Sequence, residues 1–317
     1  MTNDHRLSLE HIARASDAID DAFRDSPQFE APSLNERLGC RLVVKVETLN
    51  PIRSFKARGA LFLTSQLSGR PHLVCATAGN FGQGMAYAAR KHGFPVTVFT
   101  NSDANPLKIS RMRAMGADVR AAGTGPDEPH DAAVAFAAET GAVLVEDGRD
   151  AAIAEGAGTI GMELLRWPEP FDAIVVPLGD GALLGGVARW VKAHAPATSM
   201  IGVCAAAAPA MERSWRRGEV LVAPPKTIAD GISIQTPFKE AVTDLTGIVD
   251  DIVLVEDRTI IEGMRLAHHE LGLVLEPSGA AGLAALLAHG ERFHGKRVGT
   301  VLTGGNLTAD QVRQWLT

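Results

Sequence analysis

Apolar positions along the chain fall into short runs and into longer segments with helical spacing. In the first half they predict strands at 42–47, 73–77, 96–100, 118–122 and 143–146, and helices at 7–25, 57–67, 82–92, 106–115 and 130–140. In the second half they predict strands at 173–178, 200–205, 252–256 and 297–303, and helices at 151–167, 182–193, 259–271, 278–289 and 308–316. Strands that alternate with helices in this way form parallel sheets with right-handed crossovers. The pattern predicts an α/β fold with two open, mostly parallel sheets.

Polar or glycine-rich turns directly follow three predicted strands: Thr77-Ala78-Gly79-Asn80, Gly179-Asp180-Gly181-Ala182 and Thr303-Gly304-Gly305-Asn306. A fourth turn, Glu276-Pro277-Ser278-Gly279, follows the weaker apolar run 273–275. One such turn is ordinary, because Gly and Asn suit strand-to-helix connections. Ligands of open α/β sheets bind beyond the carboxyl ends of the strands, so we expect the four turns to meet around one ligand.

Lys56 lies between a predicted strand and a predicted helix, shortly after Asn50-Pro51. A helix N-terminus is the positive end of the helix dipole, where a cation is disfavoured and an anion is favoured. We therefore expect the Lys56 amine to have a lowered pKa and a phosphate group nearby.

The composition argues against several classes of partner. The net charge is −6 and the Lys and Arg residues are scattered, so we expect no nucleic-acid partner. No segment approaches the roughly 18 apolar residues of a membrane span, and the N-terminus has no hydrophobic signal segment. The three cysteines are far apart in sequence, which indicates neither a zinc site nor a disulfide framework. We expect a cytoplasmic protein with a small-molecule substrate and no membrane partner.

The turn at 179–183 opens a helix, so its backbone N–H groups can converge on a phosphate. A dinucleotide fingerprint would need glycine at position 184, which is leucine, and no ATPase-type phosphate loop occurs. A formal GxGxxG at 156–161 lies inside a helical pattern, and we interpret its glycines as helix-packing positions. Metal-ligand and serine-nucleophile motifs are also absent from the sequence. A reactive lysine with a phosphate cradle fits pyridoxal phosphate, which carries both an aldehyde and a phosphate.

Six motifs, in family order, resemble those of the fold-type II pyridoxal-phosphate enzymes, most closely the serine/threonine dehydratases and serine racemases. They are Ser54-Phe55-Lys56-x-Arg58-Gly59-Ala60, Ala78-Gly79-Asn80-x-x-Gln83-Gly84, Val176-Pro177-x-Gly179-x-Gly181, Ala229-Asp230-Gly231, Glu276-Pro277-Ser278-Gly279-Ala280 and Thr303-Gly304-Gly305-Asn306. The resemblance runs from about residue 42 to 306. It implies a large cofactor-binding domain of residues 1–70 and 148–317 and a small, mobile domain of residues 71–147 that closes over the substrate. We also expect a homodimer.

The resemblance assigns roles to individual residues. Lys56 would form a Schiff base with the cofactor aldehyde and later remove the Cα proton of the substrate. Phe55 would flank the ring, Asn80 would hydrogen-bond the 3′-oxygen, and Thr303 would contact the pyridine nitrogen. The full set of expected cofactor-binding residues is Lys56, Phe55, Asn80, Gly179, Asp180, Gly181, Ala182, Leu183, Glu276 and Thr303. The expected substrate-binding residues are Ser54, Thr77, Ala78, Gly79 and Asn80, and no metal site is expected.

Several positions depart from the family pattern. Arg53 stands where dehydratases typically have glycine, and we expect it either to offset Asp180 or to bind an acidic group of the substrate. Asp180 interrupts the usual run of glycines and puts a carboxylate near the expected phosphate. Ala78 stands where racemases have a serine that acts on the opposite face of the cofactor, which favours elimination over racemisation. The segment 202–209 lacks the acidic residues that bind a divalent metal in racemases.

The sequence thus predicts pyridoxal-phosphate-dependent β-elimination, in which a β-hydroxy amino acid such as serine or threonine gives a 2-oxo acid and ammonia. A replacement reaction, as in cysteine or threonine synthases, is an alternative because the loop at 179–181 resembles that of threonine synthases. Racemisation is a further enzymatic alternative, and a non-catalytic binding protein with this fold is a third class. The chain ends eleven residues after Asn306, so we expect no C-terminal effector module.

Overall fold

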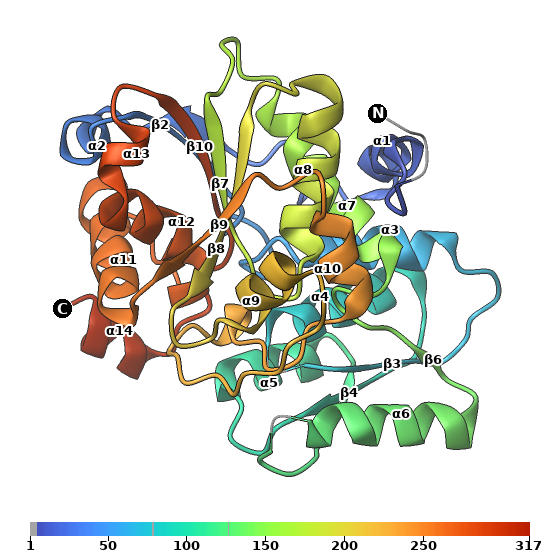
Figure 1. Ribbon diagram of the computed structural model, residues 1–317. Coiled ribbons are helices and arrows are strands. Elements are labelled where there is room, and N and C mark those ends of the chain that lie inside the picture. Colours follow the sequence, from blue (N-terminus) through green and yellow to red (C-terminus); the bar gives the residue numbers. More distant parts are fainter. Residues whose placement is uncertain (1–4, 78, 126) are drawn as a thin grey trace.

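The computed structural model describes residues 5–77, 79–125 and 127–317, and it contains two sheets (Figure 1). The larger sheet has the strand order β1 (Gln28–Glu30), β2 (Arg41–Val46), β10 (Arg297–Leu302), β7 (Ala173–Pro177), β8 (Ser199–Ala205) and β9 (Asp251–Val255). Only β1 runs antiparallel to its neighbour, and the other neighbouring pairs are parallel. The nearly continuous apolar sequence of β7 suits a strand that is covered by helices on both faces.

The smaller sheet has the order β5 (Asp118–Ala121), β4 (Val96–Thr100), β3 (Leu73–Ala76) and β6 (Val143–Leu144), and all its pairs are parallel. Helices α4 (Asn80–His92) and α5 (Pro106–Ala114) pack on one face, and α6 (Glu128–Thr140) covers the other (Figure 1). The predicted α/β fold with two mostly parallel sheets is therefore confirmed.

Two helix pairs cover the larger sheet (Figure 1). Helix α12 (Pro277–Ala288) lies between the sheet and α11 (Asp257–Leu271), which explains why α12 is apolar on almost every side. On the opposite face, α7 (Ala151–Leu164) packs against α8 (Ala182–His194).

Glycines allow α7 and α8 to approach closely. A Cβ atom on Gly186 would lie 2.0 Å from the carbonyl oxygen of Ala154, and one on Gly158 would lie 3.0 Å from that of Gly186. A Cβ on Gly156 would lie only 2.6 Å from the carbonyl oxygen of Arg58. The interpretation of the glycines at 156–161 as helix-packing positions is therefore confirmed.

The structure differs from the predicted elements mainly at short segments. Helix α1 (Leu9–Ala18) ends well before residue 25, and the prediction of a helix over 7–25 was wrong beyond Ala18. Ile19 and Phe23 are buried as their spacing implied, but they lie in the turns that follow α1. No strand forms over 273–275. Short elements that the sequence did not predict, besides β1, are α2 (Pro32–Leu38), α9 (Ala210–Arg217), α10 (Lys239–Leu245), α13 (Gly290–Phe293) and the 3-10 helix η1 (Asp230–Ile232).

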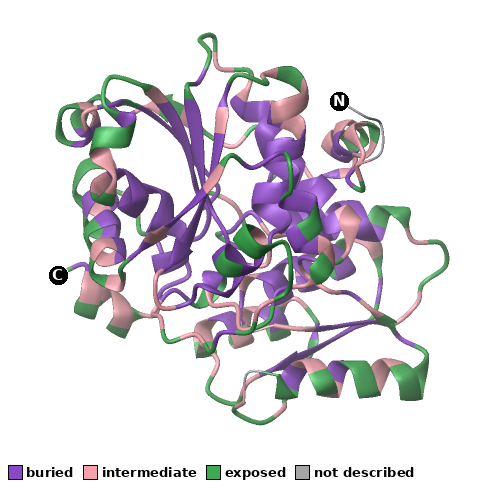
Figure 2. Cartoon of the chain, viewed as in Figure 1, coloured by how far each residue is buried: buried purple, intermediate pink, exposed green. Residues whose placement is uncertain are grey.

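Buried residues lie in both sheets and in the helices between them (Figure 2). One cluster joins Leu61 and Phe62 of α3 (Ala57–Gln66) to Leu73 and Phe81 of the smaller sheet and its helix. The core therefore does not divide at residue 70, and the assignment of 71–147 as a small domain stays a prediction. Within the described residues, no helix is long and apolar enough to cross a membrane.

Candidate active site

The stretch around Lys56 lies beyond the carboxyl ends of β2 and β10. An isolated bridge pairs Ser54 with Gly304, and the Phe55 N–H donates to the carbonyl oxygen of Thr303 at 3.2 Å. Lys56 is the N-cap residue of α3. The two segments, far apart in sequence, are thus joined by backbone contacts at the edge where α/β sheets bind ligands.

The amine of Lys56 lies between two carboxylates. It forms ion pairs with Asp147 and Asp180, and its Nζ is 2.7 Å from Oδ2 of Asp180. Burial opposes the positive charge, but the two carboxylates outweigh burial and raise the pKa of Lys56. The prediction of a lowered pKa was wrong for this arrangement, because the acidic partners come from distant segments.

The two carboxylates have different environments. Burial and the neighbouring charge of Asp180 raise the pKa of Asp147 to about 7, and its Oδ1 is buried without a hydrogen-bond partner among the described residues. Burial also acts on Asp180, but the charge of Lys56 outweighs it and lowers the pKa of Asp180. Two carboxylates thus share one ammonium group, and the uncompensated charge falls on Asp147.

The turn 179–183 has the backbone of an anion-binding loop. Gly181 has a φ of 101°, a conformation that favours glycine, and it is the N-cap residue of α8. A Cβ on Gly179 would lie 2.6 Å from the carbonyl oxygen of Gly231, so no side chain fits there. The N–H of Ala182 donates to Oδ1 of Asp180 at 2.9 Å. A carboxylate of this chain therefore accepts a hydrogen bond where the cofactor phosphate is expected.

Asn80 joins three of the predicted turns. Its Nδ2 donates to Glu276, and its Oδ1 accepts a hydrogen bond from Asn306 at 2.9 Å. Lys108 lies on the other side of Glu276, 3.3 Å from its Oε2, and is 2.8 Å from Asp230. Burial raises the pKa of Glu276. The turns around residues 80, 276 and 306 are therefore one polar network, as the sequence predicted.

The buried groups around Lys56 fit pyridoxal phosphate. The Lys56 Nζ lies 4.9 Å from the centroid of the Phe55 ring. The hydroxyl of Ser278 is buried without a partner among the described residues, and that of Thr303 has only a 3.5 Å contact with the Ser278 carbonyl oxygen. Two hydroxyls with unused hydrogen-bonding capacity suit a ring nitrogen, and the loop at 179–183 suits a phosphate.

The predicted substrate-binding residues lie at different depths. Thr77 is half-buried, and its Oγ1 accepts a hydrogen bond from the Gly79 N–H at 3.0 Å. Gly79 packs on Lys108, because a Cβ there would lie 2.9 Å from the lysine Nζ. Ser54 is fully buried behind Lys56. Ala78 lies outside the described residues.

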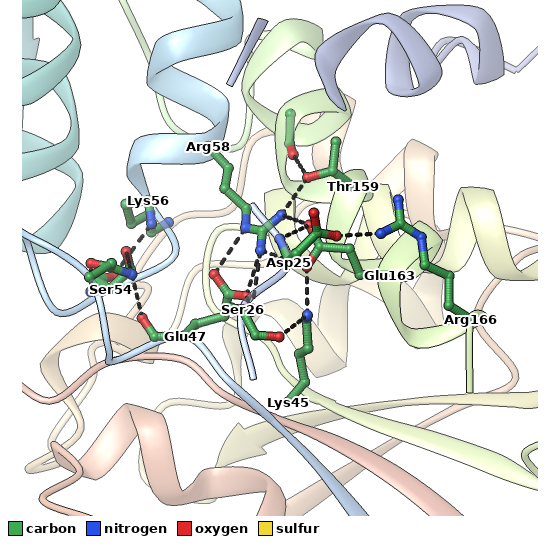
Figure 3. A network of polar contacts seen from close by, with 12 residues as sticks. Asp25, Ser26, Lys45, Glu47, Ser54, Lys56, Arg58, Thr159, Glu163 and Arg166 are labelled. Carbon is green, nitrogen blue, oxygen red and sulfur yellow. Dashed lines mark hydrogen bonds and ion pairs between the residues drawn. The ribbon is translucent and has the colours of Figure 1, made fainter. Parts of the chain in front are cut away.

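A second ion cluster fixes the position of α3 (Figure 3). Arg58 is fully buried and donates to both carboxylate oxygens of Glu47 and of Glu163 at 2.6 to 2.9 Å, and also to Thr159 at 2.9 Å. Lys45 pairs with Glu163 from the opposite side. These bonds tie the first turn of α3, directly after Lys56, to β2 and α7.

Two residues of the site were missed in the sequence analysis. Asp147, which is followed by Gly148, comes directly after the predicted strand 143–146, and this is the same signal that marked the other turns, but no family motif includes it. Lys108 lies on α5, and helical periodicity alone does not distinguish a buried lysine from a surface lysine.

Arg53 does not offset Asp180, which pairs with Lys56 instead. The expectation that Arg53 offsets Asp180 was wrong, because the Asp180 carboxylate forms its ion pair with Lys56. Within the described residues, no group of three or more His, Cys, Asp or Glu could hold a metal ion.

Comparisons with known proteins agree with the site. The model of the family described as "Pyridoxal-phosphate dependent enzyme" matches residues 19–304. An L-threonine ammonia-lyase of Geobacter sulfurreducens is 34% identical over 300 residues, which cover 93% of this chain and 75% of that protein. An L-threo-3-hydroxyaspartate ammonia-lyase of a Pseudomonas species is 31% identical over 96% of this chain and 98% of its own length.

Solved structures show the same fold. A threonine deaminase from T.th. superposes with a TM-score of 0.90 at 36% identity, covering 95% of this chain and 99% of that one. Maize serine racemase superposes with a TM-score of 0.91 at 26% identity, covering 97% and 96% of the two chains. The resemblance noted in the sequence is therefore confirmed over nearly the whole chain.

Proposed function

Because this chain belongs to the family of pyridoxal-phosphate dependent enzymes, with pyridoxal phosphate as its cofactor, we propose that it is a lyase acting on a β-hydroxy amino acid. The reaction removes the Cα proton and the β-hydroxyl group, and water then releases ammonia and leaves a 2-oxo acid. The observation that carries this proposal is the buried amine of Lys56, which lies against Asp147 and Asp180 at the meeting point of the polar and glycine-rich turns described above.

Each part of the site has a role in this proposal. Pyridoxal phosphate, when bound, withdraws electrons from Cα and makes its proton acidic. Lys56 holds the cofactor and then takes the Cα proton at Nζ. The N–H groups at 181–183 bind the phosphate, and Thr303 contacts the ring nitrogen. The turn at 77–80 binds the substrate carboxylate.

Asp147 and Asp180 control the charge of the amine. A protonated Lys56 cannot accept the Cα proton, and these two carboxylates favour its protonated form, which is why its pKa is raised. The amine must therefore leave these ion pairs and lose its proton before it can react with the cofactor aldehyde.

We also propose that residues 71–147 move as a small domain against the remainder of the chain. Asp147, at the end of this segment, contacts Lys56, and Asn80, near its start, contacts Glu276. A closing motion along these contacts would exclude water from the site.

The test is 2-oxo acid release from a panel of β-hydroxy amino acids: L- and D-serine, L-threonine, 3-hydroxyaspartate and phenylserine. Turnover of at least one of these amino acids is expected, and the absence of 2-oxo acid from all of them would refute the proposal. Chiral analysis of the recovered serine detects racemisation. Turnover that requires a phosphorylated or acetylated amino acid together with a second substrate would select the replacement reaction, which the loop Gly179-Asp180-Gly181 favours.

We further propose a cytoplasmic homodimer. The exposed side chains of Leu49 (62%) and Val274 (38%) lie on adjacent segments, because Gly305 packs against both Thr48 and the Val274 carbonyl. Neighbouring exposed apolar groups are typical of protein contacts. The cysteines are buried free thiols, as suits a reducing compartment. Sedimentation should give the mass of a dimer, and Leu49→Asp should shift it towards the monomer.

A further inference from the structure

Arg53 occupies a backbone conformation that is unfavourable for its side chain. Its φ is 51°, and Asp25 is the only other non-glycine residue in the described ranges with a positive φ. The conformation is fixed by two hydrogen bonds: the Arg53 N–H donates to the Asn50 carbonyl, and its own carbonyl accepts from the Gly305 N–H, both at 3.0 Å. Glycine would adopt this conformation without strain, so the presence of an arginine here suggests a function for its side chain.

The side chain of Arg53 has no partner that would explain its presence. It is exposed, and it makes no hydrogen bond or ion pair with any described residue. Arg111 of α5 is similar, since its guanidinium contacts the neutral amide of Asn306 and no described carboxylate lies within ion-pair distance. The other two cations of the site, Lys56 and Lys108, have two carboxylates each. The uncompensated positive charge at this site is therefore carried by two arginines.

Asn306 brings the two arginines to the same place. Its Nδ2 donates to the Ile52 carbonyl at 2.8 Å, directly before Arg53, and to Asn80 at 2.9 Å, while its Oδ1 accepts from Arg111. Burial and the charge of Arg53 lower the pKa of Arg111, so the two guanidinium groups repel each other. An anion between them would relieve that repulsion and accept hydrogen bonds from both.

We propose that Arg53 and Arg111 bind a second carboxylate of the substrate, carried on Cβ, so that the preferred substrates are β-hydroxy amino acids with two carboxylates. The inference rests on the proposed elimination. The turn at 77–80 takes the α-carboxylate and the β-hydroxyl leaves, so the remaining substituent on Cβ is the group that can reach the arginines. The planar guanidinium fork matches a carboxylate, whereas the hydrogen of serine or the methyl group of threonine would leave both charges unpaired.

The test compares Arg53→Gly and Arg111→Gln with Arg113→Gln, a control on the opposite side of the same helix. Among the described residues, the side chain of Arg113 hydrogen-bonds only the Val119 carbonyl, at 3.3 Å. The ratio of kcat/KM for 3-hydroxyaspartate to that for L-serine should fall by about tenfold or more in each arginine variant, mainly through KM. The control should keep the ratio of the unmodified enzyme. The double variant should lose less than the product of the two single losses, because both residues bind one group.

A binding measurement separates this inference from the proposed reaction. Calorimetric titration of the holoenzyme with succinate, which cannot react, should show binding that weakens about tenfold in Arg53→Gly and is unchanged in Arg113→Gln. Arg53→Gly should fold, because glycine suits the φ of position 53.

Absence of 2-oxo acid from every substrate would refute the elimination alone, and the succinate titration would still decide the role of the arginines. Equal succinate affinity in all variants, or an unchanged substrate ratio, would overturn the arginine assignment. A preference for O-phosphoserine over 3-hydroxyaspartate would overturn the assignment of the anion as a carboxylate.

Discussion

Two buried ion clusters begin two residues apart in sequence and are built differently. The Arg58 cluster (Arg58, Glu47, Glu163 and Lys45) has two cations and two carboxylates, and Arg58 is fully buried with each guanidinium nitrogen hydrogen-bonded (Figure 3). The Lys56 cluster (Lys56, Asp147 and Asp180) has one cation for two carboxylates, and its side chains are 11 to 16% exposed.

The difference distinguishes a cluster that stabilises the fold from a cluster that can take part in a reaction. In the Arg58 cluster two cations face two carboxylates, and Arg58 outweighs burial and lowers the pKa of Glu163. In the Lys56 cluster the pKa of Asp147 is raised to about 7 and one of its oxygens has no partner in the described part of the chain. Strongly perturbed groups of this kind mark functional sites.

The largest expected effect is on activity, in the Lys56 cluster. Lys56→Arg keeps the positive charge but removes the amine that binds the cofactor and takes the proton. We expect kcat to fall by about three orders of magnitude or more, while the thermal stability of the apoprotein changes little. Lys91→Arg, an exposed pair with Asp20, is the control for the same exchange at the surface. Residual activity within tenfold of the unmodified enzyme would show that Lys56 is not the base.

The next effect is on stability, in the Arg58 cluster. Arg58→Met leaves Glu47 and Glu163 buried, with the Lys45–Glu163 pair as their remaining ion pair among the described residues. It should cost about 3 to 5 kcal/mol of unfolding free energy. Denaturant unfolding measures the loss, and kcat per folded molecule should change far less than in Lys56→Arg. A loss below about 1 kcal/mol would mean that the cluster is not a structural anchor.

A smaller effect concerns pH. Burial and the charge of Asp180 raise the pKa of Asp147 from 3.8 to about 7, so between these values the folded apoprotein binds more protons than the unfolded chain. Its stability should therefore fall as pH rises from about 4 to about 7. Because one pKa unit corresponds to about 1.4 kcal/mol, the fall is on the order of a few kcal/mol. Asp147→Asn should flatten this slope in thermal unfolding curves, and an unchanged slope would assign the titration to another group.

The smallest effect is on cofactor affinity. Asp180→Asn removes a negative charge beside the expected phosphate. It also removes the ion pair between Asp180 and the Lys56 amine. Both changes favour the bound cofactor, so its Kd should fall by about three- to tenfold in an absorbance titration. Gly148 packs against Asp180, and asparagine keeps the shape that this contact requires. Weaker cofactor binding would indicate that Asp180 supports the phosphate.

The sequence predicted the sheets and the turns well, because strand-helix alternation and glycine-rich turns are local signals. It also identified Lys56, Asn80 and Thr303 as neighbours, since the carboxyl ends of parallel strands meet at one edge. The ends of elements were less accurate: the apolar spacing of Ile19 and Phe23 continues beyond α1, but these residues are buried from turns.

The ion-pair partners and the direction of the Lys56 pKa shift were predicted least well. The local setting of Lys56 at a helix N-terminus suggested a lowered pKa, whereas Asp147 and Asp180, 91 and 124 residues away along the chain, raise it. Asp180, one of the two partners expected for Arg53, likewise pairs with Lys56 instead. Such pairings depend on which distant side chains the fold brings within a few ångströms, and no local pattern records that.

In the proposed enzyme, Lys56 is the lysine that carries the cofactor. Borohydride reduction of the holoenzyme followed by peptide mass spectrometry locates the modified residue. We expect a pyridoxyl-phosphate group on the peptide that contains Lys56 and on no peptide that contains Lys45 or Lys108. Modification of Lys108, the other buried lysine of the site, with Lys56 unmodified would contradict it.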